Sequence, residues 1–135
     1  MKIFSLPIRV YYEDTDSGGV VYYANYLKFM ERARDEMLRA AGFEQDRLIF
    51  EECVIFAVRS ATIDYLKPAR FNELLMTTVQ VQKLGKASIV FLQEVHKAND
   101  PDFVCARAII KIACLDANKM SPTPLPTAML ECLTS

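Results

Sequence analysis

The sequence predicts an α+β domain in which one long helix is followed by a run of antiparallel strands. Three observations favour this class. Apolar residues recur with a helical period over residues 25–42, the period changes to two from Val54 onward, and Gly, Pro, Asn and Asp separate the later segments. Only the connection that holds the long helix has the length of a crossover, so a parallel sheet of βαβ units is not expected.

The first strand is expected where Ile8, Val10 and Tyr12 alternate with polar neighbours. It runs into an acidic turn that ends in two glycines, Glu13-Asp14-Thr15-Asp16-Ser17-Gly18-Gly19. Charge and glycine at this density favour a turn over a continued strand.

The long helix is expected to begin at Asn25, as its cap, and to end at Gly42. Its length would then be about 24 Å at ~1.5 Å per residue. Asp35 and Arg39, four residues apart, form a favourable pair on the polar face. The apolar face consists of Tyr26, Phe29, Met30, Ala33, Met37, Leu38 and Ala41.

Residues 44–52 are interpreted as a short helix or an irregular flap. Four strands are then expected, over residues 54–67, 73–83, 87–97 and 103–115. Gly85-Lys86 and Asn99-Asp100-Pro101 mark tight hairpins, so consecutive strands should pair antiparallel. The last strand has an apolar face of Val104, Ala106, Ala108, Ile110, Ile112 and Cys114. Three prolines, Pro122, Pro124 and Pro126, are expected to end regular structure and leave a short tail.

Composition limits the classes of function. The chain has 135 residues, which favours a single domain spanning residues 1–135. Hydrophobic residues make up 52% and charged residues 24%, so a disordered chain is excluded. Lys and Arg number 16 against 17 Asp and Glu, which leaves no basic excess to bind a run of phosphates. Nucleic acid is therefore not an expected partner.

The cellular setting follows from what the sequence contains. No apolar stretch approaches the ~20 residues needed to cross a bilayer, and no signal peptide opens the chain, so a soluble cytoplasmic protein without a transmembrane segment is expected. The four cysteines, Cys53, Cys105, Cys114 and Cys132, show no ligand-type spacing and favour reduced thiols. With His96 as the only histidine, neither a metal site nor a redox cofactor is expected.

The acidic turn before the long helix is the main candidate for chemistry. A carboxylate beside main-chain N–H groups at a helix start combines a base with an oxyanion site, which is what attack on a carbonyl requires. The alternative is that Asp14 and Asp16 only form the turn or cap it, and spacing alone favours this alternative.

A resemblance adds to this interpretation. Residues 11–26, Tyr-Tyr-Glu-Asp-Thr-Asp-Ser-Gly-Gly-Val-Val-Tyr-Tyr-Ala-Asn-Tyr, are followed by Phe29-Met30-Glu31-Arg32-Ala33-Arg34. Further matching segments are Asp64-Tyr65, Pro68-Ala69-Arg70 and residues 116–124. Together they resemble the hotdog-fold acyl-CoA thioesterases of the 4-hydroxybenzoyl-CoA thioesterase family, and within it the YbgC-like branch associated with the Tol-Pal system.

The resemblance implies a hotdog fold, in which a five-stranded antiparallel sheet wraps a long central helix. It also implies a homodimer that joins its sheets, often paired further into a homotetramer, with the thioester bound between subunits. The substrate would be an acyl-CoA, or an acyl group on an acyl-carrier protein.

The same resemblance assigns site residues. Asp16 would be the catalytic carboxylate, acting as general base on water or as nucleophile. The main-chain N–H of Tyr23 would hold the thioester oxygen, while Gly18 and Gly19 let the backbone approach. The YbgC-like branch commonly has His at the position of Tyr23, whereas the hydroxybenzoyl branch has Tyr there. A main-chain donor survives that difference, whereas any role of an imidazole does not. Packing of an aromatic ring explains Tyr23 equally well.

Coenzyme A carries phosphates, so cations are expected near the mouth of the pocket. The candidates are Arg59, Arg70, Lys86 and Lys119, of which Arg59 and Lys86 are preferred, and a solvated surface charge is the simpler explanation for each of them alone. Phe56, Val58 and the segment Leu48-Ile49-Phe50 are candidates to line an acyl tunnel, although core packing explains each of them as well.

The sequence therefore predicts an acyl-CoA thioesterase that works without a metal or redox cofactor. The main alternative is a non-catalytic hotdog module that binds acyl-CoA or acyl-carrier protein. A hotdog dehydratase or hydratase ranks lower, because it needs a histidine beside the active-site carboxylate and His96 lies far along the chain.

Overall fold

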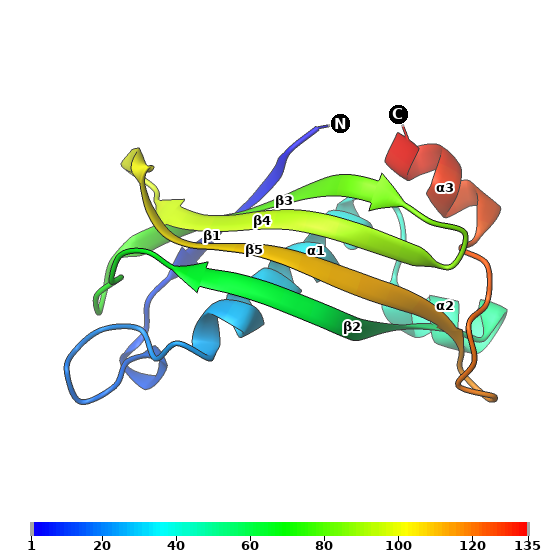
Figure 1. Cartoon of the computed structure of the whole chain (residues 1–135), viewed down its shortest axis with the longest axis horizontal. Helices are drawn as coiled ribbons and strands as arrows, with labels where there is room; N and C mark the ends of the chain where they lie inside the picture. The colour runs from blue at the N-terminus through cyan, green and yellow to red at the C-terminus, as the bar shows by residue number, and fades with distance from the viewer. Residues whose placement is uncertain (1, 135) are drawn as a thin grey trace.

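A five-stranded antiparallel sheet with helix α1 on one face forms the body of the protein (Figure 1). The computed structural model describes residues 2–134. The strands lie in the order β1 (Phe4–Arg9), β3 (Leu74–Leu84), β4 (Ser88–Lys97), β5 (Asp100–Asp116) and β2 (Val54–Tyr65). The predicted α+β class and the hotdog arrangement of helix and sheet are confirmed.

Strand pairing is only partly sequential. The strands β3, β4 and β5 are joined by hairpins and pair as predicted, whereas β2 pairs with β5 and β1 pairs with β3. The consecutive strands β2 and β3 are therefore not neighbours in the sheet. Residues 66–73, which include Pro68, are too long a link for a tight hairpin and carry the chain from one side of the sheet to the other (Figure 1).

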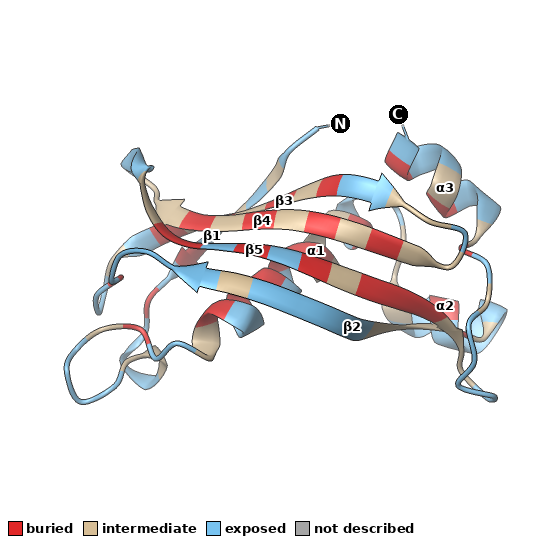
Figure 2. Cartoon of the chain, viewed as in Figure 1, coloured by how far each residue is buried: buried red, intermediate tan, exposed pale blue. Residues whose placement is uncertain are grey.

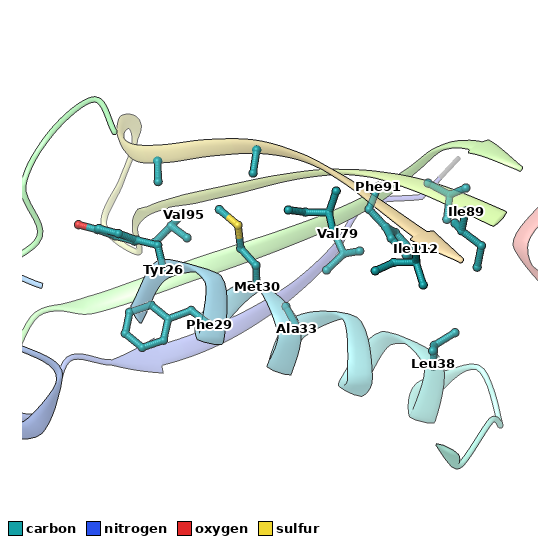
Figure 3. Packing of buried hydrophobic residues seen from close by; sticks show 14 of the residues in the cluster. Tyr26, Phe29, Met30, Ala33, Leu38, Val79, Ile89, Phe91, Val95 and Ile112 are labelled. Atoms are coloured by element: carbon teal, nitrogen blue, oxygen red, sulfur yellow. The ribbon is translucent and has the colours of Figure 1, made fainter. Parts of the chain in front are cut away.

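Helix α1 (Asn25–Ala40) packs its apolar face against the sheet, as Figure 3 shows. Phe29, Met30 and Ala33 are fully buried there, opposite Val79 and Val95 of the sheet. Truncating a buried Phe or Met at such a site typically costs about 2–5 kcal/mol, so this face accounts for a large share of the stability. Met37 and Ala41, also expected on this face, are only half-buried.

Two predictions about the ends and surface of α1 need correction. Asn25 is the first helical residue and not the cap, a position taken by Ala24 without a side-chain hydrogen bond. Arg39 does not pair with Asp35; it pairs with Glu36 and Glu44, while Asp35 accepts a hydrogen bond from Gln45 of α2 (Gln45–Glu52). The prediction that Gly42 ends the helix is confirmed: it follows the last turn and has φ +98°, the left-handed conformation that favours glycine after a helix.

Three other boundaries differ from expectation. Strand β1 ends at Arg9, so Tyr12 lies outside it. Tyr12–Asp14 form a single 3₁₀ turn instead, which the hydrogen bond from the Tyr11 N–H to the Asp14 carboxylate stabilises. The second hairpin turns at residues 98–99, so Asp100 and Pro101 belong to β5. The residues after Pro126 are not a loose tail but helix α3 (Thr127–Thr134), which buries Met129 and Leu133 against the core.

Two cysteines of β5, Cys105 and Cys114, are free thiols buried in the core. Burial raises the pKa of each thiol to about 11. At pH 8 only about one molecule in a thousand would then hold either thiolate, which is the reactive form. We expect a disulfide reagent to leave both residues unmodified in the native protein and to modify both in denaturant. Peptide mass spectrometry measures this, and equal labelling in the two states would contradict it.

Candidate active site

The acidic segment after β1 closes into a compact loop at the end of the molecule where α1 begins (Figure 1). Thr15 and Val21 pair across the base of the loop, and the Asp16 N–H donates to the Val20 carbonyl at 2.9 Å. Gly19 donates its N–H back to the Asp16 carbonyl at 3.0 Å and has φ +79°. This left-handed conformation suits glycine, which explains one of the two glycines in the motif.

The carboxylate of Asp16 is exposed on this loop. Its Oδ1 accepts the Gly18 N–H at 2.8 Å, an arrangement that stabilises the turn. Its Oδ2 accepts no hydrogen bond from any residue in 2–134. Asp16 lines a cavity of about 410 Å³ together with Tyr12, Thr15, Ser17, Gly19 and Phe71. One oxygen thus supports the loop and the other is available to a ligand.

Asp14 has a different environment. Its Oδ2 accepts the Tyr11 N–H at 2.8 Å, and its main-chain carbonyl accepts the Tyr22 N–H at 2.9 Å. The turn-forming alternative considered for both aspartates therefore describes Asp14 well. Asp16 also has one oxygen that supports the turn, but it differs from half-buried Asp14 in being exposed and in lining the 410 Å³ cavity.

The start of α1 leaves two main-chain donors open. The Asn25 N–H donates to the Tyr22 carbonyl at 2.9 Å, which closes a turn through Tyr23 and Ala24. The N–H groups of Tyr23 and Ala24 themselves donate to no other residue within 2–134. Open N–H groups at the positive end of a helix favour an oxygen that carries negative charge.

The ring of Tyr23 lies in a row of aromatic side chains. It meets Tyr65 edge-on at 5.8 Å between centroids, and Tyr65 in turn contacts Tyr26 at 5.8 Å. The Tyr26 hydroxyl accepts the Ala69 N–H, and burial raises the pKa of Tyr26 to about 12. A second cavity of about 250 Å³ opens here, lined by Val21, Tyr23, Tyr26, Tyr65, Leu66, Lys67 and Pro68. The ring of Tyr23 therefore packs against other aromatic side chains, independently of what its main-chain N–H does.

The predicted phosphate-binding cations are scattered within one chain. Arg70 lies beside the acidic loop, because it pairs with Val20 and its neighbour Phe71 donates its N–H to the Gly19 carbonyl. Arg59 is the extra residue of a bulge in the middle of β2. Lys86 lies in the turn between β3 and β4, at the opposite end of the sheet from the loop (Figure 1). Lys119 lies beyond β5, also at that far end.

One cation near the site was missed by the sequence argument. Lys67 lines the second cavity, and its ammonium lies 4.8 Å from the centre of the Phe103 ring. The signal was its position directly before Pro68-Ala69-Arg70, the segment that carries part of the resemblance.

A third, smaller cavity of about 70 Å³ lies between α1, α2 and the sheet. Phe56 and Val58 line it, as expected for tunnel residues, but Leu48, Ile49 and Phe50 do not. Arg34 is buried at its wall and donates to Gln93 Oε1 at 2.9 Å. Burial lowers the pKa of Arg34, opposed by Glu31 and Asp35. Of the two alternatives for residues 44–52, the short helix is confirmed as α2, in which Leu48 is buried while Ile49 and Phe50 are 42% and 85% exposed.

Two features are absent from the described range. Residues 2–134 hold no group of three or more His, Cys, Asp or Glu side chains arranged to bind a metal ion. Nor does any helix among those residues have the length and apolar character needed to span a membrane.

Comparison with known proteins decides the family. Residues 10–133 match the Thioesterase-like superfamily. The chain belongs to that superfamily. It is 44% identical to the acyl-CoA thioesterase YbgC of Haemophilus influenzae over 123 residues, which cover 91% of this chain and 88% of that protein. The resemblance noted for residues 11–34 is thereby confirmed, including the YbgC-like branch.

Two solved structures have the same fold as this member of the Thioesterase-like superfamily. A probable thioesterase from Bartonella henselae is 32% identical with a TM-score of 0.86, covering 93% of this chain and all of that one. A 1,4-dihydroxy-2-naphthoyl-CoA thioesterase from Synechocystis has a TM-score of 0.91 at 22% identity, covering 99% and 97%. At that identity the second likeness shows the fold alone.

Proposed function

We propose that this protein hydrolyses acyl-CoA thioesters to a carboxylic acid and free coenzyme A. The observation that carries the proposal is the pairing of two features at one end of the fold: the exposed Asp16 carboxylate with an open Oδ2, and the open N–H groups of Tyr23 and Ala24. Relatives named as acyl-CoA thioesterases support the choice of substrate.

The proposed reaction uses these groups in two roles. Asp16 removes a proton from water that attacks the thioester carbon, or attacks that carbon itself. The carbonyl oxygen then gains negative charge, which the Tyr23 N–H stabilises at the helix start. The C–S bond breaks as the carbonyl re-forms, and the coenzyme A sulfur leaves as a thiolate that takes up a proton. Attack by Asp16 would add an anhydride intermediate that water hydrolyses.

The non-catalytic binding module remains the second candidate, because its pocket would be the same. A steady-state survey that detects released thiol separates the two, using short, long and aromatic acyl-CoA together with an acyl-carrier protein carrying one of the same groups. Turnover of any of these supports the enzyme. Binding without thiol release across the whole panel would favour the module.

The phosphates of coenzyme A need cations near the cavities. We propose Arg70 and Lys67 for this role, since both lie on the segment that closes the site. Arg59 and Lys86 take part only if a second subunit brings them to the site, because within one chain they lie away from Asp16 (Figure 1).

We propose a homodimer that joins through β2. This edge strand is pale along most of its length in Figure 2, and it is the last strand of the sheet. Val58 and Tyr65 pair with buried residues of β5 and so face the helix side, yet they are 57% and 45% exposed. An apolar inner face with a free edge suits an antiparallel second copy, because a two-fold axis pairs the strand with itself.

Charge placed on that inner face should separate the subunits. Ala61 pairs with buried Ile110, whereas its neighbour Thr62 pairs with exposed Ile109 on the outer face. We expect sedimentation to give twice the mass of one chain for wild type and Thr62→Glu, and a monomer with most of the turnover lost for Ala61→Glu. The same experiment would detect a homotetramer, whose mass is four times that of one chain. A monomeric wild type at micromolar concentration contradicts the interface.

We also propose that residues 1–135 act as one catalytic domain in the cytoplasm. The free thiols of Cys53, Cys105 and Cys114 support a reducing compartment.

A further inference from the structure

The main-chain carbonyl of Asp14 is a junction between the acidic loop and α1. It accepts the Tyr22 N–H at 2.9 Å and also the Asn25 side-chain amide, Nδ2, at 2.9 Å. The second bond is partly buried and spans 11 positions of sequence. Within residues 2–134 it is the one side-chain hydrogen bond that ties the segment 11–23 to α1.

The use of Asn25 here is unexpected from its residue type. Asn at a helix start normally caps the helix, with its side-chain oxygen accepting an N–H of the first turn. Asn25 instead donates its amide to the Asp14 carbonyl, and Ala24 takes the cap position without a side-chain hydrogen bond. Separately, the N–H groups of Tyr23 and Ala24 donate to no side chain in the described range.

The hydrogen bond from Asn25 to the Asp14 carbonyl, called the tie below, also bears on where Asp16 lies. Asp16 follows Asp14 by two residues, and its own N–H is fixed to Val20. Holding the Asp14 carbonyl against the start of α1 fixes the root of this loop relative to the Tyr23 N–H. Misplacement of a reacting group by about 1 Å can cost about 100-fold in rate, so loss of this hydrogen bond is expected to lower turnover.

We propose that Asn25 is a positioning residue: its amide holds the Asp14–Asp16 arm against the helix start, so that the Asp16 carboxylate and the Tyr23 N–H address the same thioester carbonyl. The inference rests on the proposed function and adds a residue to it. Asn25 does not touch the reacting atoms in this scheme; it acts through Asp16.

Two substitutions remove the tie in different ways. Asn25→Ala deletes the amide while placing the best helix former in the first turn. Asn25→Asp keeps the shape but sets a carboxylate oxygen against the Asp14 carbonyl, while an acid near the helix start favours the helix itself. We expect kcat for an acyl-CoA substrate to fall about 10- to 100-fold in both, with KM changed less than about threefold. Lys28→Ala, an exposed position on the same helix, is the matched control and should keep wild-type turnover.

A double-mutant cycle with Asp16→Asn separates positioning from general damage. If Asn25 acts through Asp16, adding Asn25→Ala to Asp16→Asn should change kcat less than about twofold, because the group being positioned is already lost. Full multiplication of the two effects would overturn the proposal, as would wild-type kcat in both Asn25 variants. If Asp16→Asn alone keeps full turnover, the proposed function fails first, so the two failures are distinguishable. Melting temperatures of all variants monitor folding.

Discussion

Asp16→Asn is expected to lower kcat for acyl-CoA hydrolysis by about 10²–10⁴-fold, the range for losing a positioned general base. The substitution is nearly isosteric. Its amide oxygen can still accept the Gly18 N–H that Asp16 Oδ1 accepts at 2.8 Å, so the loop should keep its shape. What is lost is the basic oxygen, Oδ2, that no residue within 2–134 engages. Steady-state thiol release measures the effect, with KM expected to change little.

Asp14→Asn is the matched control for this experiment. Asp14 lies two residues away in the same turn, and an Asn there can still accept the Tyr11 N–H. The hydrogen bond is kept and only its acceptor loses its charge, which changes its contribution by about 1 kcal/mol. We therefore expect turnover within about threefold of wild type and a similar melting temperature. Equal losses in the two variants would mean that the loop, and not the Asp16 carboxylate, is responsible. Retained activity in Asp16→Asn would remove that residue from the mechanism.

Tyr23→Pro is expected to lower kcat by about 10²–10³-fold, the effect of removing one oxyanion-hole donor. Proline has no main-chain N–H, so the substitution deletes the donor itself. The turn that Asn25 closes onto Tyr22 holds Tyr23 at its second position, where proline is favoured. The Tyr23 N–H donates to no residue within 2–134, so no internal hydrogen bond is broken.

Tyr23→Phe tests the phenol hydroxyl separately from the main-chain N–H. It keeps the N–H and the edge-on contact with Tyr65, and it removes only the hydroxyl. We expect its kcat to stay within about threefold of wild type, as a main-chain donor does not depend on the side chain. A large loss in Tyr23→Phe would show that the phenol hydroxyl contributes, whereas no loss in Tyr23→Pro would show that the main-chain N–H is not required. Circular dichroism confirms that each variant folds.

Local patterns in the sequence determined the elements of this fold. Helix α1 and the alternating strands β3, β4 and β5 follow from periodicity, because each buries one face on a neighbour (Figure 3). Helix α3 escaped prediction because three prolines precede it, and its two buried residues are recognised only beside the core they cover. The order of the strands escaped it too, since pairing of β2 with β5 is a long-range contact that no turn signals.

The motif placed the candidate site in the sequence, and the tertiary structure decided how its residues divide the work. Asp14 and Asp16 look equivalent in the chain, and each uses one carboxylate oxygen to support the turn, but only Asp16 is exposed and lines the cavity. Asn25 has the residue type of a helix cap, and only the approach of the Asp14 carbonyl turned it into a tie. Hydrogen-bond partners are chosen by distance in space, and distance along the chain does not predict them.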